Sequence, residues 1–411
     1  MSVKLWHHGD FRRLWAGDTV TQFGTFVSLT VLPLVAATAL AVTPFEMGLL
    51  SAAEHAAFLL FGLPAGVWID RMRRKPLMIS ANVVRGVALL TVPVAWWTGV
   101  LSLPHLLVVA LAVGVCTLFF DVAYQSYLPS LVGREHLVEG NAKLQASQSV
   151  AQVAGPGVGG GLAQLAGAAN AVALTGLSYL ASAVLLRRIR AVEPPPERDP
   201  GRRLTTEVAE GLRFVFGNPN LRAIVGCTGT ANLASGAFVA MEILFLTRDL
   251  RLSAGAVGVV LAIGGAGGVL GALTAGWWAR RVGQARTILI SALTSMPVLL
   301  LVPLAEPGWG AVLVAGALAV YGYGVIVYNV AQVSYRQAIC PDRLLGRMNA
   351  SIRFVVWGLL PVGQLAGGVL GEWLGVRGAI WAAAVVSALC GLWVLFSPLR
   401  RLRNLPSEVA A

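Results

Sequence analysis

The chain has 411 residues, of which 56% are hydrophobic and only 12% are charged, and its mean hydropathy is +0.73. A soluble chain carries roughly 25% charged residues, so this composition excludes an ordinary soluble enzyme. The net charge of +12 does not mark a nucleic-acid-binding face, because the basic residues fall in short clusters between apolar runs. The composition therefore predicts an integral membrane protein.

Apolar runs long enough to cross a bilayer follow one another along the whole chain. A spanning helix needs about 20 apolar residues, and twelve segments meet that requirement. The first follows a polar start over residues 1–13 and is too long for a signal peptide, so we expect it to be retained. The expected helices cover residues 14–40, 46–69, 77–98, 103–128, 143–166, 170–187, 221–246, 255–279, 287–305, 310–334, 348–371 and 378–397.

The basic residues are distributed unevenly between the connections of these helices. Of the 31 Lys and Arg residues, 26 lie in one set of alternate connections, and the other set holds only Arg248, Arg251 and Arg377. The positive-inside rule places the basic set in the cytoplasm. Only three of the basic residues are Lys, which with abundant Ala and Gly favours a bacterial source. We therefore expect a multi-pass protein of the bacterial cytoplasmic (inner) membrane with both termini in the cytoplasm.

A polar stretch between residues 187 and 222 contains three consecutive prolines and eight arginines and divides the chain almost in half. Within it, Leu204, Val208, Leu212 and Val215 recur at helical spacing, which predicts an amphipathic helix at the membrane surface. A plain structural strut is the alternative role of this helix. The expected organisation is an N-terminal six-helix bundle over residues 1–190, a cytoplasmic linker over 191–220, a C-terminal six-helix bundle over 221–398 and a cytoplasmic tail over 399–411.

The two halves of the chain are similar to each other. A shift of 208 residues places Asp121-Val122-Ala123 on Asn329-Val330-Ala331 and Gly159-Gly160 on Gly367-Gly368. Six helices, an even number, separate equivalent positions, so the halves have the same orientation in the membrane. We expect an all-α membrane protein of 12 transmembrane helices, built as two parallel six-helix bundles. Parallel repeats with a substrate site between them are the arrangement of major facilitator transporters.

The loop after the second helix carries a motif of that group. Residues Gly66 to Lys75 read G-V-W-I-D-R-M-R-R-K, which resembles the signature G-x-x-x-D-R-x-G-R-[RK] of the major facilitator superfamily, with Arg73 in place of the second glycine. The resemblance implies a gate latch at the cytoplasmic side, and a simple positive-inside anchor is the alternative. The residues of this gating loop are Gly66, Asp70, Arg71, Arg74 and Lys75. In the second half Arg280 stands where Asp70 stood.

The fifth expected helix carries Gly155-Pro156-Gly157-Val158-Gly159-Gly160, which resembles the G-P-x-x-G-G motif of exporters in the superfamily. Small residues let membrane helices approach closely, and proline bends a helix. This motif, Gly155, Pro156, Gly159 and Gly160, favours export over import. The string over residues 119–129, followed by Asn141-Ala142, resembles the branch that includes macrolide efflux proteins and the enterobactin exporter, also called transmembrane secretion effectors.

Six ionisable residues fall inside the expected helices. A charge at mid-membrane costs at least about 2.5 kcal/mol, so each is a functional candidate. We predict Asp121 as the principal proton or substrate carboxylate and Glu54 as the second. A static salt bridge between Asp121 and Arg85 is the alternative, and Asp18 and Glu242 are expected nearer the membrane faces, where solvation competes with a functional role. The six are Asp18, Glu54, Arg85, Asp121, Glu242 and Arg353.

Polar and aromatic side chains are available to line a cavity between the bundles, since the resemblance implies that helices 1, 4, 7 and 10 line it. This lining suits a broad, amphipathic ligand better than a sugar, which needs a denser set of hydrogen bonds. Helix-to-helix packing is the alternative role of each residue. The candidates are Gln22, Gln125, Asn232, Tyr321, Tyr323, Asn329 and Gln332.

No catalytic set, phosphate-binding loop, metal site or cofactor site can be assembled from the sequence, so we expect no enzyme activity, cofactor or metal. The expected function is secondary active export of amphipathic small molecules, drugs or secondary metabolites, by proton-coupled antiport, as in multidrug resistance. The alternative is a dedicated exporter of one endogenous metabolite such as a siderophore. The expected partners are a small-molecule substrate, protons and the lipid bilayer, with no nucleic acid, and the resemblance implies a monomer.

Overall fold

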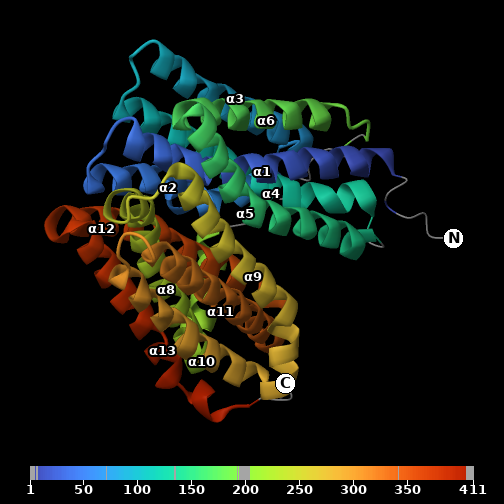
Figure 1. Cartoon of the computed structure of the whole chain (residues 1–411). Coiled ribbons are helices and arrows are strands. Elements are labelled where there is room, and N and C mark those ends of the chain that lie inside the picture. The colour runs from blue at the N-terminus through green and yellow to red at the C-terminus, as the bar shows by residue number, and fades with distance from the viewer. Residues whose placement is uncertain are drawn as a thin grey trace. The chain divides into compact units, whose positions relative to one another are not determined.

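The computed structural model describes residues 5, 8–70, 72–133, 136–191, 193, 204–340 and 342–403, and in those residues it contains helices and no strand. Residues 192 and 194–203 of the expected linker and the end of the tail lie outside this part of the chain. The helices, all but α7 labelled in Figure 1, are α1 (Gly9–Thr38), α2 (Pro44–Asp70), α3 (Arg74–Trp97), α4 (Leu103–Val132), α5 (Leu137–Ala166), α6 (Ala168–Arg187), α7 (Leu204–Gly217), α8 (Pro219–Leu244), α9 (Ala254–Val282), α10 (Gln284–Ser295), α11 (Gly310–Ile339), α12 (Asp342–Cys390) and α13 (Leu392–Leu395).

The predicted all-α membrane fold is confirmed. Nine helices or helix pairs in the described residues are long and apolar enough to cross a membrane. One of them, Ser351–Leu395, holds two of the expected spans, because α12 continues through the expected loop with a kink at Gly375. Gly375 has a φ of +74°, a conformation that glycine adopts without steric penalty. With α12 counted on both sides of this kink, twelve expected spans have a helical counterpart.

Several helices are longer than expected at the ends rich in basic residues. Thus α1 begins at Gly9 rather than at residue 14, and α5 begins at Leu137 rather than at residue 143. Hydropathy detects only the part of a helix that lies in hydrocarbon, whereas the backbone hydrogen bonds continue into the polar ends.

The expected helix over residues 287–305 is divided. After α10 the chain tightens into a 3₁₀ helix over Met296–Leu304. Pro297 has no backbone N–H to donate, so the regular helical hydrogen-bond pattern is interrupted at this point. Earlier in the chain, α8 is followed directly by a π-helical turn over Phe245–Asp249.

The chain forms two compact units. Unit 1 comprises Met1–Val42, Ala53–Arg202 and Ser253–Ala262, and unit 2 comprises Thr43–Ala52, Arg203–Leu252 and Ile263–Ala411. The first residues of α2 thus belong to unit 2, and the first residues of α9 belong to unit 1. Each unit has its own buried apolar core, which includes Phe11, Met78 and Phe120 in unit 1 and Ile224, Met296 and Tyr335 in unit 2.

The helix expected within the linker is present as α7. Its Val215 is buried and belongs to an apolar cluster with Leu221 of α8 and Met348 of α12. The side chains of Leu204 and Val208, on which its amphipathic character was partly predicted, lie outside the described residues. The part that is described packs against the helices of unit 2.

Candidate functional site

Unit 1 contains a polar cavity of about 620 Å³ between α1, α4 and α5. Three residues predicted from the sequence line it: Asp18 and Gln22 from α1, and Gln125 from α4. Asp18 is buried, with 2% of its surface exposed. The Gln22 amide nitrogen donates to Asp18 Oδ1 at 3.4 Å.

The opposite wall of this cavity comes from α5 and was missed by sequence reasoning. Asn141, Gln145 and Gln148 all line the cavity, and their spacing of four and three residues places them on one face of a helix. The available signal was the helical spacing of these three polar residues, which begins just before the helix expected over residues 143–166. Tyr124, which also lines the cavity, completes an amphipathic lining of amides, one carboxylate and one aromatic ring.

Tyr124 connects the cavity with a buried cation. Its ring stacks on Phe120, with centroids 6.2 Å apart. The Arg85 guanidinium carbon lies 4.7 Å from the Phe120 centroid and 4.4 Å from the centroid of Tyr179 on α6. Arg85 is therefore held between two aromatic rings, an arrangement that favours a planar guanidinium.

A hydrogen-bond network fixes this arginine. Arg85 donates to Thr117 Oγ1 at 3.2 Å and to Asn82 Oδ1. The Asn82 amide nitrogen donates to Thr21 Oγ1 at 3.1 Å and to Ser182 Oγ at 2.9 Å. Thr21, Asn82, Arg85 and Ser182 are buried and Thr117 is partly buried, so the network joins α1, α3, α4 and α6 inside unit 1.

The predicted carboxylates of unit 1 lie around the same region. Asp121 is four residues before Gln125 on α4, and hence on the face that borders the cavity. The charges of Asp121 and Arg85 both act on Asp18, and those of Arg85, Asp121 and Glu54 act on Tyr179. The structure therefore brings together four of the six ionisable residues predicted from the sequence.

The other two predicted ionisable residues and the remaining cavity candidates belong to unit 2 and have different surroundings. Arg353 on α12 is exposed, and Glu242 lies two residues before the end of α8. The Asn232 amide nitrogen donates to the Val356 carbonyl at 2.8 Å, and Gln332 Nε2 donates to Asn329 Oδ1 at 3.4 Å. Asn232 thus serves the packing of α8 on α12.

Two predicted aromatic residues of α11 also make contacts within unit 2. The Tyr323 hydroxyl accepts a hydrogen bond from Trp278 Nε1 at 2.6 Å and another from Thr274 Oγ1 at 2.9 Å. Tyr321 is partly exposed and contacts the buried cluster around Tyr328. Tyr323 therefore joins α11 to α9.

Part of the predicted gating loop lies outside the residues whose surroundings the structure describes, namely Gly66, Asp70 and Arg71. The remaining two residues start α3. The backbone N–H groups of Arg74 and Lys75 donate to the Glu193 carboxylate at 2.7 and 3.1 Å, and Lys75 Nζ donates to the Ile189 carbonyl. A carboxylate from the segment after α6 therefore caps α3, where the partial positive charge of the helix favours it.

The glycines of the predicted exporter motif are points of close helix contact. A Cβ added at Gly155 would lie 2.5 Å from Phe26 Cβ of α1, and one added at Gly159 would lie 3.1 Å from Val31 Cγ2 of α1. A Cβ at Gly160 would lie 2.4 Å from the Ala254 carbonyl oxygen and 2.7 Å from Gly258 Cα of α9. Pro156 lies between these positions, inside α5.

Comparison with known proteins agrees with this architecture. A sequence model described as the Major Facilitator Superfamily matches residues 14–362 and, in a second match, residues 233–410. The chain is similar to the enterobactin exporter EntS of Escherichia coli O1:K1, with 26% identity over 383 residues, covering 89% of this chain and 87% of that protein. The same protein of Shigella boydii has the same identity and coverage.

Among solved structures, the chain resembles the nucleoside transporter NupG with a TM-score of 0.76 and 12% identity, covering 94% of this chain and 98% of that one. It also resembles a bacterial homologue of the iron transporter ferroportin in an inward-facing state, with a TM-score of 0.74, 16% identity, and coverage of 94% and 98%. At these identities the likeness concerns the fold alone.

Proposed function

Because the chain belongs to the Major Facilitator Superfamily, we propose that it is a secondary active exporter of amphipathic small molecules, drugs or secondary metabolites, driven by proton antiport through alternating access. The protein is a multi-pass membrane transporter and not an enzyme. The observation that carries the proposal is the cavity of unit 1, in which a buried carboxylate faces amide side chains and an aromatic ring.

The cavity lining suits an organic cation with an apolar body. The Asp18 carboxylate supplies a negative charge, and the face of Tyr124 attracts a cation through its ring quadrupole. The amides of α5 accept or donate hydrogen bonds without demanding one ligand geometry, which fits a broad substrate range. Asn141, Gln145 and Gln148 would then set how polar a substrate can be.

Coupling requires a group that exchanges a proton for the substrate. Asp121 is our proposed principal carboxylate, because its position four residues before Gln125 places it on the face of α4 that borders the cavity. A protonated carboxyl group is neutral, and loss of its proton creates the charge that holds a cation. Entry of a second proton from the opposite side of the membrane would release the substrate there. Glu54 and Arg85 would tune this exchange.

The remaining expectations belong to the same proposal. The protein would lie in the bacterial inner membrane as a monomer, with both termini in the cytoplasm and with its six-helix bundles over residues 1–190 and 221–398. The gating loop would close the cytoplasmic side, and the cap formed by Glu193 would hold the start of α3 in place.

A dedicated exporter of one endogenous metabolite is the second candidate. The similarity to a protein named as an enterobactin exporter, which covers most of both chains, favours this alternative. A siderophore carries several acidic or neutral oxygen donors, so its export would depend on the amides of α5 and on Arg85 more than on Asp121.

Accumulation of a fluorescent cationic dye in an efflux-deficient bacterium tests the proposal. We expect cells that express the protein to hold less dye than vector cells, and a protonophore to remove the difference. Equal dye levels with confirmed membrane expression would favour the dedicated exporter, which a comparison of metabolites in the medium of wild-type and deletion strains would then identify.

A further inference from the structure

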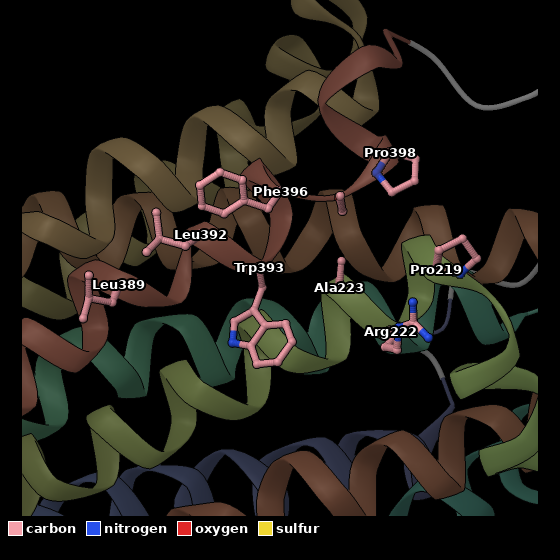
Figure 2. A pocket seen from close by; sticks show the side chains of 9 residues that line it. Pro219, Arg222, Ala223, Leu389, Leu392, Trp393, Phe396 and Pro398 are labelled. Carbon is pink, nitrogen blue, oxygen red and sulfur yellow. The ribbon is translucent and has the colours of Figure 1, made fainter.

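A second cavity, of about 510 Å³, lies in unit 2 and contains no residue assigned above to transport. It is formed between the start of α8 and the chain from the end of α12 through α13. Figure 2 shows Leu389 at one end of this groove and Arg222, Pro219 and Pro398 at the other. The residues that line it are Pro219, Arg222, Ala223, Leu389, Leu392, Trp393, Phe396, Ser397 and Pro398.

The groove exists because α8 presents small residues to a large aromatic one. A Cβ added at Gly226 would lie 2.7 Å from Trp393 Cδ2, so the indole lies directly against the backbone of α8. The Trp393 Nε1 group donates to Thr230 Oγ1 at 3.1 Å, which fixes the ring. Ala223, one turn before Gly226 on α8, lines the groove together with the indole.

The walls of the groove are apolar and exposed on the outside of the unit. Trp393 is 51% exposed and Phe396 76% exposed. In a chain that spans a membrane, such side chains at a helix end contact lipid, and tryptophan in particular is enriched where acyl chains meet headgroups. The groove therefore opens toward the bilayer at the level of the headgroups.

One end of the groove carries the positive charge of Arg222, the charged residue that lines it. Arg222 lies in the first turn of α8 and is exposed, and no ion pair of its guanidinium is found among the described residues. Past Pro398 the chain continues with Arg400, Arg401 and Arg403, which are exposed as well. An apolar groove that ends at an exposed arginine, beside a segment with three more arginines in sequence, complements a molecule with an acyl chain and an anionic head.

We propose that this groove binds one anionic phospholipid, with an acyl chain along Leu389, Leu392 and Trp393 and the phosphate on Arg222. The volume of the groove falls within the range of about 300–1,000 Å³ typical of small-molecule sites. A free phosphate would leave the apolar walls uncovered, and a zwitterionic lipid would not neutralise the arginines. The anionic phospholipid is the occupant that satisfies both parts of the groove.

The test is photo-labelling of the full-length protein in nanodiscs. Phosphatidylglycerol and phosphatidylcholine, each with a photoreactive group on one acyl chain, are added at equal amounts, and the labelled peptides are mapped by mass spectrometry. We expect the peptide that contains residues 389–398 to be labelled by phosphatidylglycerol well above phosphatidylcholine. Equal labelling by the two lipids, or no labelling of this peptide, would overturn the proposal.

Variants locate the headgroup. In Arg222→Gln, unlabelled phosphatidylglycerol should compete about fivefold more weakly with the photoreactive lipid for labelling of this peptide. This is the effect expected for the loss of one basic residue near a membrane surface. Arg222→Lys should restore the competition. Arg188→Gln removes an exposed arginine from unit 1 and should change nothing. Equal competition in Arg222→Gln and wild type would contradict the assignment. Competition by soluble glycerol phosphate as strong as that by the lipid would show an anion site without an acyl chain and would likewise overturn it.

Discussion

Gly160 of α5 and Gly258 of α9 lie so close together that a Cβ built on either one would be within 3.0 Å of the Cα of the other. A second pair has the same relationship in unit 2, where a Cβ on Gly48 of α2 would lie 2.7 Å from Gly368 Cα of α12. Gly368 is the residue that a shift of 208 places on Gly160, so the internal repeat extends to these contacts. Both pairs allow helices to cross at backbone distance.

The first prediction concerns Gly160→Ala. The added methyl group would meet the Ala254 carbonyl oxygen at 2.4 Å, and overpacking of this kind costs about 1–3 kcal/mol. The cost falls on the conformation that contains the crossing, so we expect efflux to fall roughly tenfold with normal membrane expression. Gly161→Ala is the matched control, because a Cβ there meets nothing within 4 Å. If the two variants transport alike, the crossing has no role in transport.

The second prediction extends this test to unit 2. Gly48→Ala should impair efflux as Gly160→Ala does, since its Cβ would lie 2.7 Å from both the Gln364 carbonyl oxygen and Gly368 Cα. Gly62→Ala on the same helix meets nothing within 4 Å and should transport normally. Normal efflux by Gly48→Ala would mean that only one of the two crossings matters. The measurement is again dye efflux, normalised to the amount of protein in the membrane.

The third prediction concerns Arg85→Lys. A lysine keeps the charge but cannot place a planar group between Phe120 and Tyr179 or reach both Asn82 and Thr117. Loss of those buried hydrogen bonds should lower the free energy of unfolding by about 1–3 kcal/mol. The midpoint of thermal unfolding in detergent measures this, with Arg188→Lys on an exposed position as the control. Equal midpoints for both variants would show that the Arg85 network does not stabilise unit 1.

The fourth prediction concerns the cap on α3. Glu193→Ala removes the acceptor of two backbone N–H groups, and loss of a helix cap costs about 0.5–2 kcal/mol. We expect faster hydrogen exchange in the first turns of α3, with α5 unaffected. Glu139→Ala removes another carboxylate, which pairs with Lys143 at 3.4 Å, and should leave exchange in α3 unchanged. Unchanged exchange in Glu193→Ala would argue against the cap.

The sequence was sufficient to predict the membrane fold, because apolar runs, alternation of basic loops and the internal repeat are all local or periodic signals. It also located the residues of close helix contact, since glycines such as Gly160 stand in a recognisable motif. It did not predict the start of α5 at Leu137 or the course of α12, where Gly375 kinks a helix instead of ending it.

The site was only partly predictable for a physical reason. Asp18, Gln22 and Gln125 stand out as polar residues in apolar helices, and each was found. The network joins Asn82 to Thr21, which is 61 positions away in the sequence, and to Ser182, which is 100 positions away. No local sequence pattern reports such contacts. The polar face of α5 was overlooked because Asn141 lies outside the apolar run that defined the expected helix.

The central claim is that a carboxylate beside the cavity of unit 1 exchanges protons for substrate. Its most direct test is substrate-induced proton movement in liposomes that contain the purified protein and a pH-sensitive dye, with Asp121→Asn, Asp18→Asn and the surface variant Glu139→Gln compared with wild type. We predict that, in the presence of a proton gradient across the liposome membrane, adding substrate causes wild type and Glu139→Gln to move protons. Asp121→Asn should bind or exchange substrate without moving protons. Proton movement by Asp121→Asn at the wild-type rate would contradict the account.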